Sequence, residues 1–359
     1  MSGCQSVIIP TANSLDHASN TLDSLEKLEA PPHETILVQN ALPDDSRYRD
    51  FNRYTDFANH YKDIGLKIFF ESTPGLLSGR HRGAAEATGD LLIFVDDDVT
   101  FASDWLSELS GVFDNPKIAL AGGPSVPVFA YEPPQWLKNC WQSTPCGGRQ
   151  MAQLSLLQLD TNDTIDVDPD LVWGLNYAIR RDALNTLGGF HPDCVPASLQ
   201  HFQGDGETGL SQKITEAGRR AVYNPNAIVH HHIGPERMTK SYFDQRSFYQ
   251  GVCNSYTEIR SGTDPTPLPD TEGSDRSFPP LQWARRLKRS LRPSVAQDDL
   301  PARFFRAYVR GFNFHRACVR SSPRLLQWVR QETYFDYHYP TLEPNFSPAP
   351  REVHDPADR

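Results

Sequence analysis

Gly89-Asp90-Leu91-Leu92-Ile93-Phe94-Val95-Asp96-Asp97-Asp98 places five consecutive apolar residues directly before three carboxylates. An apolar run of this length, preceded by Gly and Asp, is typical of a buried strand. Carboxylates that follow such a strand gather at one edge of a sheet, where they repel one another and resist the loss of water. Either a divalent cation with oxygen ligands neutralises them, or they form a solvated acidic turn.

Neighbouring segments favour the cation. Three further strands are predicted, at residues 6–11, 35–38 and 66–70, with helical segments between them. Strands that alternate with helices at this pace predict an α/β fold with a mostly parallel sheet and helices on both faces. Ligands bind beyond the carboxyl ends of the strands in such sheets. Pro10-Thr11, Gln39-Asn40 and Asp96-Asp97-Asp98 all lie at strand ends, so we expect them to share a ligand site.

The composition narrows the class of protein. The 359 residues are 38% hydrophobic and 22% charged, as in a globular chain of one large or two ordinary domains. A formal net charge of −10 argues against nucleic acid as a partner. No stretch approaches the roughly 18 apolar residues that span a bilayer, and no signal pattern begins the chain. Six dispersed cysteines without a C-x-x-C pair predict free cytoplasmic thiols.

The chain after the acidic run is less regular. Residues 122–169 are rich in Pro, Gly, Trp and Gln and are predicted to be a long crossing segment. Beyond it we expect strands at 172–181, 221–223 and 227–232, and helices at 182–187 and 207–218. In the last strand His230 and His232 share one face and His231 takes the other. A neutral imidazole beside carboxylates would favour Mn²⁺ over Mg²⁺, although a lone histidine is more often structural.

Five blocks in order resemble glycosyltransferase family 2, the nucleotide-sugar glycosyltransferases of the GT-A type. These blocks are Ile8–Asn13, Gly75–Asp90, the D-x-D motif Asp96–Asp98, Gly174–Phe190 and Gly206–Leu210. A D-x-D motif alone is a weak signal, whereas five blocks in the family's order are specific. The resemblance extends over about residues 6–232. It implies transfer of a sugar from a nucleoside-diphosphate sugar to a hydroxyl group.

On the donor side, the resemblance implies a divalent cation, Mn²⁺ or Mg²⁺, that bridges both phosphates as a Lewis acid. Asp98 is expected to bind it directly, with Asp96 near the ribose or a metal-bound water. Asp97 is expected to contact the nucleotide or to be structural. Arg80, expected at a helix start, would add positive charge beside the diphosphate, with a surface salt bridge as its alternative role. His231 aligns best with a metal contact of the family.

The nucleotide is expected to lie against Pro10, Thr11 and Gln39, with Asn176 as a further contact. Gln39 stands where the family usually has Asp. Its amide oxygen can accept a hydrogen bond from the ring N–H of uracil, so uridine is the preferred base, with guanosine or thymidine open. Ala12 stands where an aromatic residue is common, so one packing contact with the base is expected to be missing.

Glu207 aligns with the family's catalytic carboxylate, which is usually Asp. A base here would remove the proton of the acceptor hydroxyl as the new bond forms. One base and one displacement fit an inverting reaction, which the resemblance also implies. Asp205, two residues earlier, would be the base if this loop aligned with the family's catalytic position in a different register. The structural alternative for Glu207 is a carboxylate favoured by a helix N-terminus.

Two other functions stay open. A nucleotidyltransferase also uses acidic strand ends and a metal, but it normally carries a Gly- and Lys-rich phosphate loop, which residues 10–13 lack. A catalytically inactive module that binds a nucleotide or a sugar is the other candidate. The retained Asp96, Asp98 and Glu207 argue against it.

Three regions are expected: a nucleotide-sugar-binding half (1–125), an acceptor and catalytic half (126–260), and a linker, basic helical appendage and flexible tail (261–359). From Arg276 to Arg330, thirteen Lys or Arg residues stand against two acids. Helices expected at 283–291 and 302–319 either pack on the core or use residues 283–330 to contact an anionic membrane or a phosphate-bearing lipid acceptor.

The expected location is therefore cytoplasmic, peripheral to the inner face of the membrane. The acceptor class stays open between a saccharide, a lipid-linked molecule and a small molecule. Residues 264–280 are expected to form a linker, and residues 344–359 are expected to be disordered.

Overall fold

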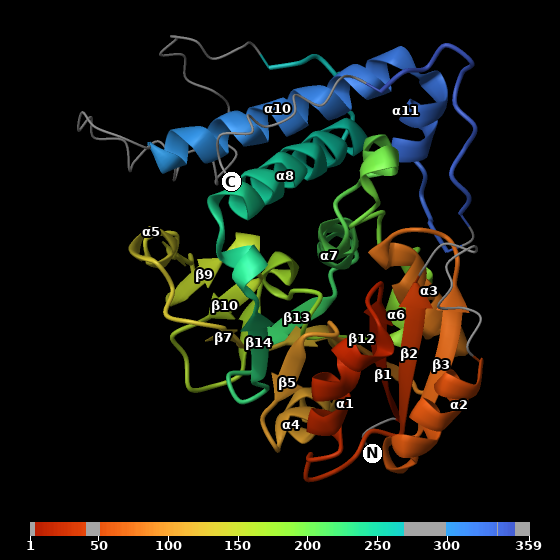
Figure 1. Cartoon of the computed structure of the whole chain (residues 1–359), viewed down its shortest axis with the longest axis vertical. Helices are drawn as coiled ribbons and strands as arrows, with labels where there is room; N and C mark the ends of the chain where they lie inside the picture. Colours follow the sequence, from red (N-terminus) through yellow and green to blue (C-terminus); the bar gives the residue numbers. More distant parts are fainter. Residues whose placement is uncertain (1–3, 41–50, 269–298, 336, 349–359) are drawn as a thin grey trace.

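The computed structural model describes residues 4–40, 51–268, 299–335 and 337–348. Its α/β core is built on a large mixed sheet with the strand order β11-β13-β6-β12-β4-β1-β2-β3 (Figure 1). Apart from β11 and β12, the strands of this sheet run in the same direction, so the predicted mostly parallel sheet is confirmed. The strands are Gln5–Thr11 (β1), Glu34–Asn40 (β2), Leu66–Glu71 (β3), Leu91–Phe94 (β4), Ile118–Gly122 (β6), Ile165–Val167 (β11), Tyr177–Arg180 (β12) and Arg220–Tyr223 (β13).

Both faces of this sheet are buried, which explains why its central strands are continuous apolar runs. Ile8 of β1 lies opposite Ile36 of β2 and Phe94 of β4, and all three belong to one hydrophobic core. Ile9 and Ile93, which point the other way, belong to a second core on the opposite face. Helices α3, α6 and α7 contribute to the first core, and α1 and α4 to the second. The helices are Ser19–Leu25 (α1), Phe51–His60 (α2), Leu76–Glu86 (α3), Trp105–Gly111 (α4), Arg181–Thr186 (α6) and Glu207–Glu216 (α7).

A second sheet corrects the prediction for residues 122–169. Its order is β5-β14-β7-β10-β9-β8. Most of it comes from the segment that we expected to be an irregular crossing. Its elements are Val99–Phe101 (β5), Ser125–Phe129 (β7), Gln142–Ser143 (β8), Arg149–Met151 (β9), Leu156–Gln158 (β10) and Val229–Ile233 (β14), with the short helix Gln135–Lys138 (α5) between β7 and β8. Strands of two to five residues are too short to show an alternating pattern in the sequence, so the prediction was wrong there.

The C-terminal region packs on the core through two long helices that lie side by side, Lys240–Arg260 (α8) and Leu300–Ser321 (α10) (Figure 1). The backbones approach closely where glycines face the partner helix. A Cβ on Gly251 would overlap the carbonyl of Tyr308, and one on Gly311 would overlap the carbonyl of Phe248. The helix predicted at 302–319 is therefore confirmed as part of α10, and a short helix, Pro323–Val329 (α11), follows.

Other expectations for this region have mixed outcomes. The helix expected at 283–291 lies outside the described residues, as does most of the predicted linker. Within the described ranges, no helix is both long and apolar enough to cross a membrane.

The segment after α11 packs back on the α/β core. Tyr334 N–H donates to the Gly188 carbonyl over 3.3 Å, and Tyr339 hydroxyl donates to the Pro74 carbonyl over 2.6 Å. Phe346 packs on the ring of His201 at 5.1 Å. Residues 344–348 are thus ordered against the core, contrary to the predicted disorder, whereas residues 349–359 lie outside the described part of the chain.

Glu34 binds the strands of the large sheet to one another at their amino ends. The side chain is buried at the start of β2, where its carboxylate accepts from the hydroxyl of Ser6 over 2.6 Å and from the backbone N–H of Thr88 over 2.5 Å. Lys67 Nζ of β3 lies 2.6 Å away. Burial acts to raise the pKa of Glu34, but Lys67 and the other donors outweigh it and lower the pKa to about 2.

Glu34→Gln should therefore destabilise the fold in a pH-dependent way. A carboxyl whose pKa falls from 4.5 in the unfolded chain to about 2 contributes stability above pH 4.5 and loses it as the pH falls toward 2. We expect the variant to lower the free energy of unfolding by about 2 kcal/mol at neutral pH, with the difference shrinking as the pH falls below 4.5. Urea unfolding at a series of pH values measures this. Glu86→Gln, at an exposed ion pair on α3, is the matched control, and a pH-independent difference would contradict the assignment.

Candidate active site

A cavity of ≈ 210 Å³, the donor-side cavity, lies at the carboxyl ends of β1, β2 and β4. Its walls come from the end of β1 and the residues after it, from Asn40 and Leu76, from the acidic triplet, and from Cys194 and Arg237. The strand ends that the sequence suggested would meet, with the exception of Gln39, do line one site.

Asp97 fixes the turn after β1 to the end of β4. The side chain is buried, and its Oδ2 accepts from Thr11 Oγ1 and from Asn13 Nδ2, the latter over 2.9 Å. His17 Nε2 lies 3.8 Å from the other oxygen. These contacts correspond to the structural alternative for Asp97, and they explain why Thr11 and Asn13 are polar at the end of an apolar strand.

Asp98, which lines the donor-side cavity, lies against the buried His231 of β14. His231 is buried on β14, and its Nδ1 lies 3.0 Å from the Leu154 carbonyl. A carbonyl only accepts, so Nδ1 carries the proton and Nε2 presents a lone pair. This Nε2 lies 3.4 Å from Asp98 Oδ1, a buried oxygen with no hydrogen-bond partner among the described residues. Two acceptor atoms at this distance suit a shared cation, so the donor set fits a divalent metal ion.

The guanidinium of Arg237 already places a positive charge beside Asp98 and His231. Its Nη2 lies 2.7 Å from Asp98 Oδ2, and its Nη1 donates to His231 Nε2 over 2.8 Å. Burial acts to raise the pKa of Asp98, yet its neighbours His231 and then Arg237 hold it below the ordinary value. His230 and His232 flank His231 on the more exposed face of β14, as the alternation predicts.

The pKa of Asp96 is shifted upward, in the opposite direction to that of Asp98. Burial and then the charge of Asp98 raise the pKa of Asp96 to about 6, although Arg80 acts against the shift. A second possible ligand group at the same place consists of His17, Asp97 and Asp98, whose nearest ligand atoms lie within 4.8 Å of one another. His17 was not predicted from the sequence.

Glu207 lines a second cavity of ≈ 170 Å³, the acceptor-side cavity, which also contains Asp193, Asp205 and Arg246. Asp193 lines this cavity, and the next residue, Cys194, lines the donor-side cavity. Glu207 is the first residue of α7, as predicted.

Arg80 pairs with Glu207 and does not stand at a helix start, while its expected role beside the diphosphate stays a prediction. It lies in the interior of α3, is 2% exposed and lines neither cavity, so the expected position at a helix start was wrong. Its Nη1 donates to Glu207 Oε2 over 3.0 Å, while the backbone N–H of Gly174 donates to Oε1 over 2.9 Å. Burial favours the neutral form of Arg80, but Glu207, Asp96 and Asp193 raise its pKa. A Cβ on Gly174 would overlap Arg80, so this ion pair requires glycine there.

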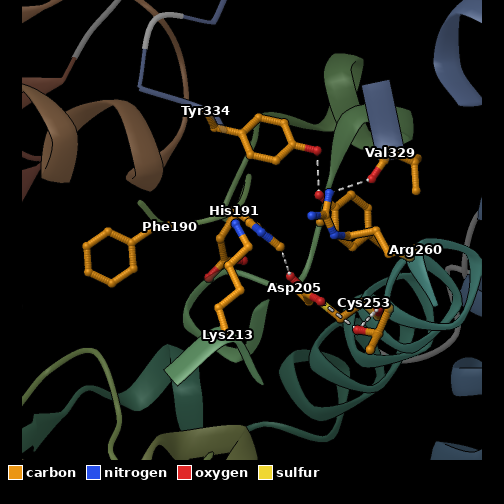
Figure 2. A network of polar contacts seen from close by, with 12 residues as sticks. Phe190, His191, Asp205, Lys213, Cys253, Arg260, Val329 and Tyr334 are labelled. Carbon is orange, nitrogen blue, oxygen red and sulfur yellow. Dashed lines mark hydrogen bonds and ion pairs between the residues drawn. The ribbon is translucent and has the colours of Figure 1, made fainter. Parts of the chain in front are cut away.

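Asp205 is committed to a buried network (Figure 2). Its Oδ1 lies 2.8 Å from His191 Nδ1, and its Oδ2 accepts from the hydroxyl of Thr257 over 2.7 Å. A Cβ on Gly209 would overlap the His191 ring, which explains the glycine in the first turn of α7. Both carboxylate oxygens of Asp205 are thus engaged, whereas the Glu207 side chain is 24% exposed.

The other two predicted contacts of the nucleotide lie beneath the site. Asn176 is buried, with its Oδ1 accepting from Trp105 Nε1 over 3.0 Å and its Nδ2 donating to the Ala227 carbonyl over 2.9 Å. Gln39 is also buried, and its Nε2 donates to the Asn13 carbonyl over 3.0 Å. Neither residue lines the two cavities, and their roles in nucleotide binding stay predictions.

Three charged residues of the site escaped the sequence reasoning: Asp193, Arg237 and Arg246. Burial and then the charge of Glu207 raise the pKa of Asp193, so a second carboxyl group lies close enough to Glu207 to interact with it. Each of the three follows or interrupts an ordinary polar stretch, and each reaches the site through tertiary folding. Of the three, Asp193 alone lies close to the end of a recognised block, Gly174–Phe190.

Comparison with known proteins identifies the class. The sequence model of glycosyl transferase family 2 matches residues 6–187, just over half of the chain. The chain therefore belongs to this family and is a glycosyltransferase, which confirms the resemblance found in the sequence.

Individual relatives are distant. The chain is 25% identical over 249 residues to a glucosyl-dolichyl phosphate glucuronosyltransferase of Haloferax volcanii, covering 67% of this chain and 72% of that protein. It is 25% identical over 196 residues to a pre-mycofactocin glycosyltransferase of Mycobacterium tuberculosis, covering 55% of this chain and 37% of the relative. A mannosyltransferase of Pyrobaculum calidifontis, solved in complex with GDP-Man and Mn²⁺, aligns with a TM-score of 0.48 at 19% identity over 73% of this chain and 65% of that one.

Replacing Arg80 tests the ion pair with Glu207. Arg80→Met leaves a mostly buried carboxylate unpaired, so we expect the free energy of unfolding to fall by about 3 kcal/mol. In the double variant with Glu207→Gln the loss should be smaller than the sum of the two single losses, because the orphaned charge is absent. Urea unfolding of the four proteins gives this coupling. Arg82→Met, whose ion pair with Glu86 is partly exposed on the same helix, should change stability by less than about 1 kcal/mol, and additive losses at Arg80 and Glu207 would refute the pairing.

Proposed function

We propose that the chain is a metal-dependent, inverting glycosyltransferase that moves a sugar from a nucleoside-diphosphate sugar, preferably a UDP-sugar, to a hydroxyl acceptor. One observation carries the proposal. Asp98 Oδ1 and His231 Nε2 are acceptor atoms 3.4 Å apart, and Asp98 lines the donor-side cavity together with Asp96, while Glu207 lines the second cavity.

The charge of the donor-side cavity argues for the metal. Three neighbouring carboxylates repel a diphosphate, and a divalent cation reverses the sign of that interaction. Asp98, His231 and Asp96 are the residues that would hold the ion, and oxygen with imidazole nitrogen favours Mn²⁺ over Mg²⁺. When bound, the ion supplies Lewis-acid stabilisation of the charge that develops on the leaving diphosphate.

The nucleotide base is proposed to bind at the turn after β1, next to Gln39, which is buried behind this turn and does not itself line the cavity. Gln39 Oε1 is buried and has no hydrogen-bond partner among the described residues, while its Nε2 holds the carbonyl of Asn13. A free amide oxygen suits the ring N–H of uracil, and this is the basis for preferring uridine. Pro10 and Thr11 line the same cavity and are proposed to pack on the nucleotide.

Glu207 is the proposed general base. Burial acts to raise its pKa, but Arg80 and the N–H of Gly174 lower it, so the carboxylate is ionised and able to accept a proton. The acceptor oxygen forms its bond to the sugar carbon as the bond to the diphosphate breaks, and its proton passes to Glu207. A single displacement of this kind inverts the configuration at that carbon. Asp205 is the weaker candidate because His191 and Thr257 occupy both of its oxygens.

A lipid-linked acceptor is the version we favour over a free saccharide or a small molecule. The relative from Haloferax volcanii carries a dolichyl phosphate substrate in its name. Two arginines of α10, Arg303 and Arg316, form ion pairs with Asp244 and Glu258 of α8. The exposed arginines on α10 and α11 and directly after α11 are Arg306, Arg320, Arg324 and Arg330. Through these we propose peripheral contact with the anionic inner face of a membrane, on the cytoplasmic side.

Vesicle sedimentation tests the membrane contact. More protein should sediment with vesicles that contain an anionic phospholipid than with neutral ones, and the excess should disappear at high salt. Arg320→Glu with Arg324→Glu should reduce the excess. Lys27→Glu with Lys117→Glu, which makes the same charge change on exposed residues elsewhere, should not. Equal sedimentation with both kinds of vesicle removes the membrane from the proposal.

Asp98→Asn and Glu207→Gln should fail at different steps of the reaction. With Mn²⁺ and a panel of nucleotide sugars, Asp98→Asn should abolish turnover and weaken Mn²⁺-dependent nucleotide binding, because the ligand charge is lost. Glu207→Gln should bind the nucleotide normally and lower transfer by about 100-fold or more, since the base is lost. Calorimetry and product analysis measure the two effects. Wild-type turnover in Asp98→Asn refutes the metal site, and retained transfer in Glu207→Gln moves the base to Asp205.

The same assays distinguish the two alternative functions. Release of pyrophosphate from a nucleoside triphosphate would indicate a nucleotidyltransferase, and a wild-type protein that binds the nucleotide sugar without turnover would indicate an inactive binding module.

A further inference from the structure

Arg237 lies where the donor and its metal are proposed to bind. It belongs to the short 3-10 turn Pro235–Met238 that directly follows β14, and its side chain lines the donor-side cavity. One guanidinium nitrogen contacts Asp98 Oδ2 at 2.7 Å and another donates to His231 Nε2 at 2.8 Å. A single cation thus bridges two of the proposed metal ligands.

Three features of this contact favour the release of Arg237 from Asp98 and His231 when another cation binds. A neutral imidazole with its lone pair toward a carboxylate needs a positive partner on that side, and the guanidinium supplies it. At the same time the Arg237 side chain is 30% exposed, and its guanidinium group is carried on a long, flexible chain. The Arg80 side chain, by contrast, is only 3% exposed. Asp98 Oδ1 is left without a hydrogen-bond partner among the described residues, so the guanidinium does not satisfy the whole ligand set.

We propose that Arg237 is an exchangeable counter-cation of the donor site. Without a donor it binds Asp98 and His231; when a divalent cation and a nucleoside diphosphate bind, it gives up these ligands and pairs with the phosphates. This inference rests on the proposed function and deepens it. It adds a residue that binds the donor. It also explains how the repulsion between the clustered carboxylates is reduced before the metal binds.

Two consequences separate this role from a structural salt bridge. The metal alone must displace a guanidinium, so its affinity for the free enzyme is reduced. The nucleoside diphosphate offers the displaced guanidinium a new partner, so metal and nucleotide strengthen each other's binding reciprocally. A merely structural ion pair would stabilise the fold and leave this coupling unchanged.

Binding of Mn²⁺ without any nucleotide provides the test. The signal of free Mn²⁺ in electron paramagnetic resonance, read during a titration, gives the affinity of wild type, Arg237→Gln and Arg237→Lys. We expect Arg237→Gln to bind Mn²⁺ alone about tenfold more tightly, and to lose about tenfold of the gain in Mn²⁺ affinity that UDP produces in the wild type. Arg237→Lys, which keeps the charge without the two-pronged contact, should fall between them. Arg149→Gln, on β9 with its guanidinium over the ring of Trp141, is the control and should match the wild type.

The outcomes distinguish this proposal from the proposed function. If Asp98→Asn leaves Mn²⁺ binding unchanged, the metal site itself is refuted. If Mn²⁺ binding depends on Asp98 but Arg237→Gln binds Mn²⁺ no more tightly than wild type, only the exchange is overturned. If Mn²⁺ adds nothing to UDP binding in the wild type while Arg237→Gln abolishes UDP binding, the guanidinium is a permanent substitute for the metal, and the exchange is again overturned. Should Arg237→Gln unfold, the affinity of Arg237→Lys decides in the same way.

Discussion

The ion pair between Arg80 and Glu207 is the constraint on which the geometry of the site depends. It joins α3, which packs beside β1 and β2, to the first turn of α7. Arg80 is buried and Glu207 is only 24% exposed, so moving either partner leaves a mostly buried charge without its counter-charge. Gly174 must lack a side chain for the pair to form, and its N–H completes the contacts of Glu207. Gly174 and Glu207 are therefore two parts of one electrostatic arrangement.

The C-terminal region belongs to this arrangement as well. Tyr337 hydroxyl contacts Ser78 and Tyr339 hydroxyl donates to the Pro74 carbonyl, so the last described segment holds the first turn of α3, and with it Arg80. On α8, Thr257 donates to Asp205, two residues before Glu207. Helix α8 in turn packs closely on α10 at Gly251 and Gly311. What the sequence presents as an appendage thus helps to fix both ends of the ion pair.

How much of this the sequence could predict depends on the range of the interaction. The strand before Asp96 and the helix that begins at Glu207 are local patterns, since burial and periodicity act over neighbouring residues. The strand ends could be placed together because parallel strands share an edge. The partner of Arg80 could not be predicted, since Glu207 lies 127 residues away and reaches it only through tertiary packing. The second sheet was missed for a related reason: strands as short as Gln142–Ser143 carry no period of their own.

Charge compensation explains the state of each carboxylate in the site. Asp97 is satisfied by Thr11 and Asn13, Asp98 by Arg237, and Glu207 by Arg80. Asp96 has no salt-bridge partner among the described residues, and its pKa is the one raised to about 6. In the proposed reaction, a divalent cation and an anionic diphosphate would bring compensating charges as a pair, so the buried Arg80–Glu207 contact would not have to change. Glu207 can then stay ionised in the acceptor-side cavity while the charge of the donor-side cavity is rearranged around Asp96, Asp98 and Arg237.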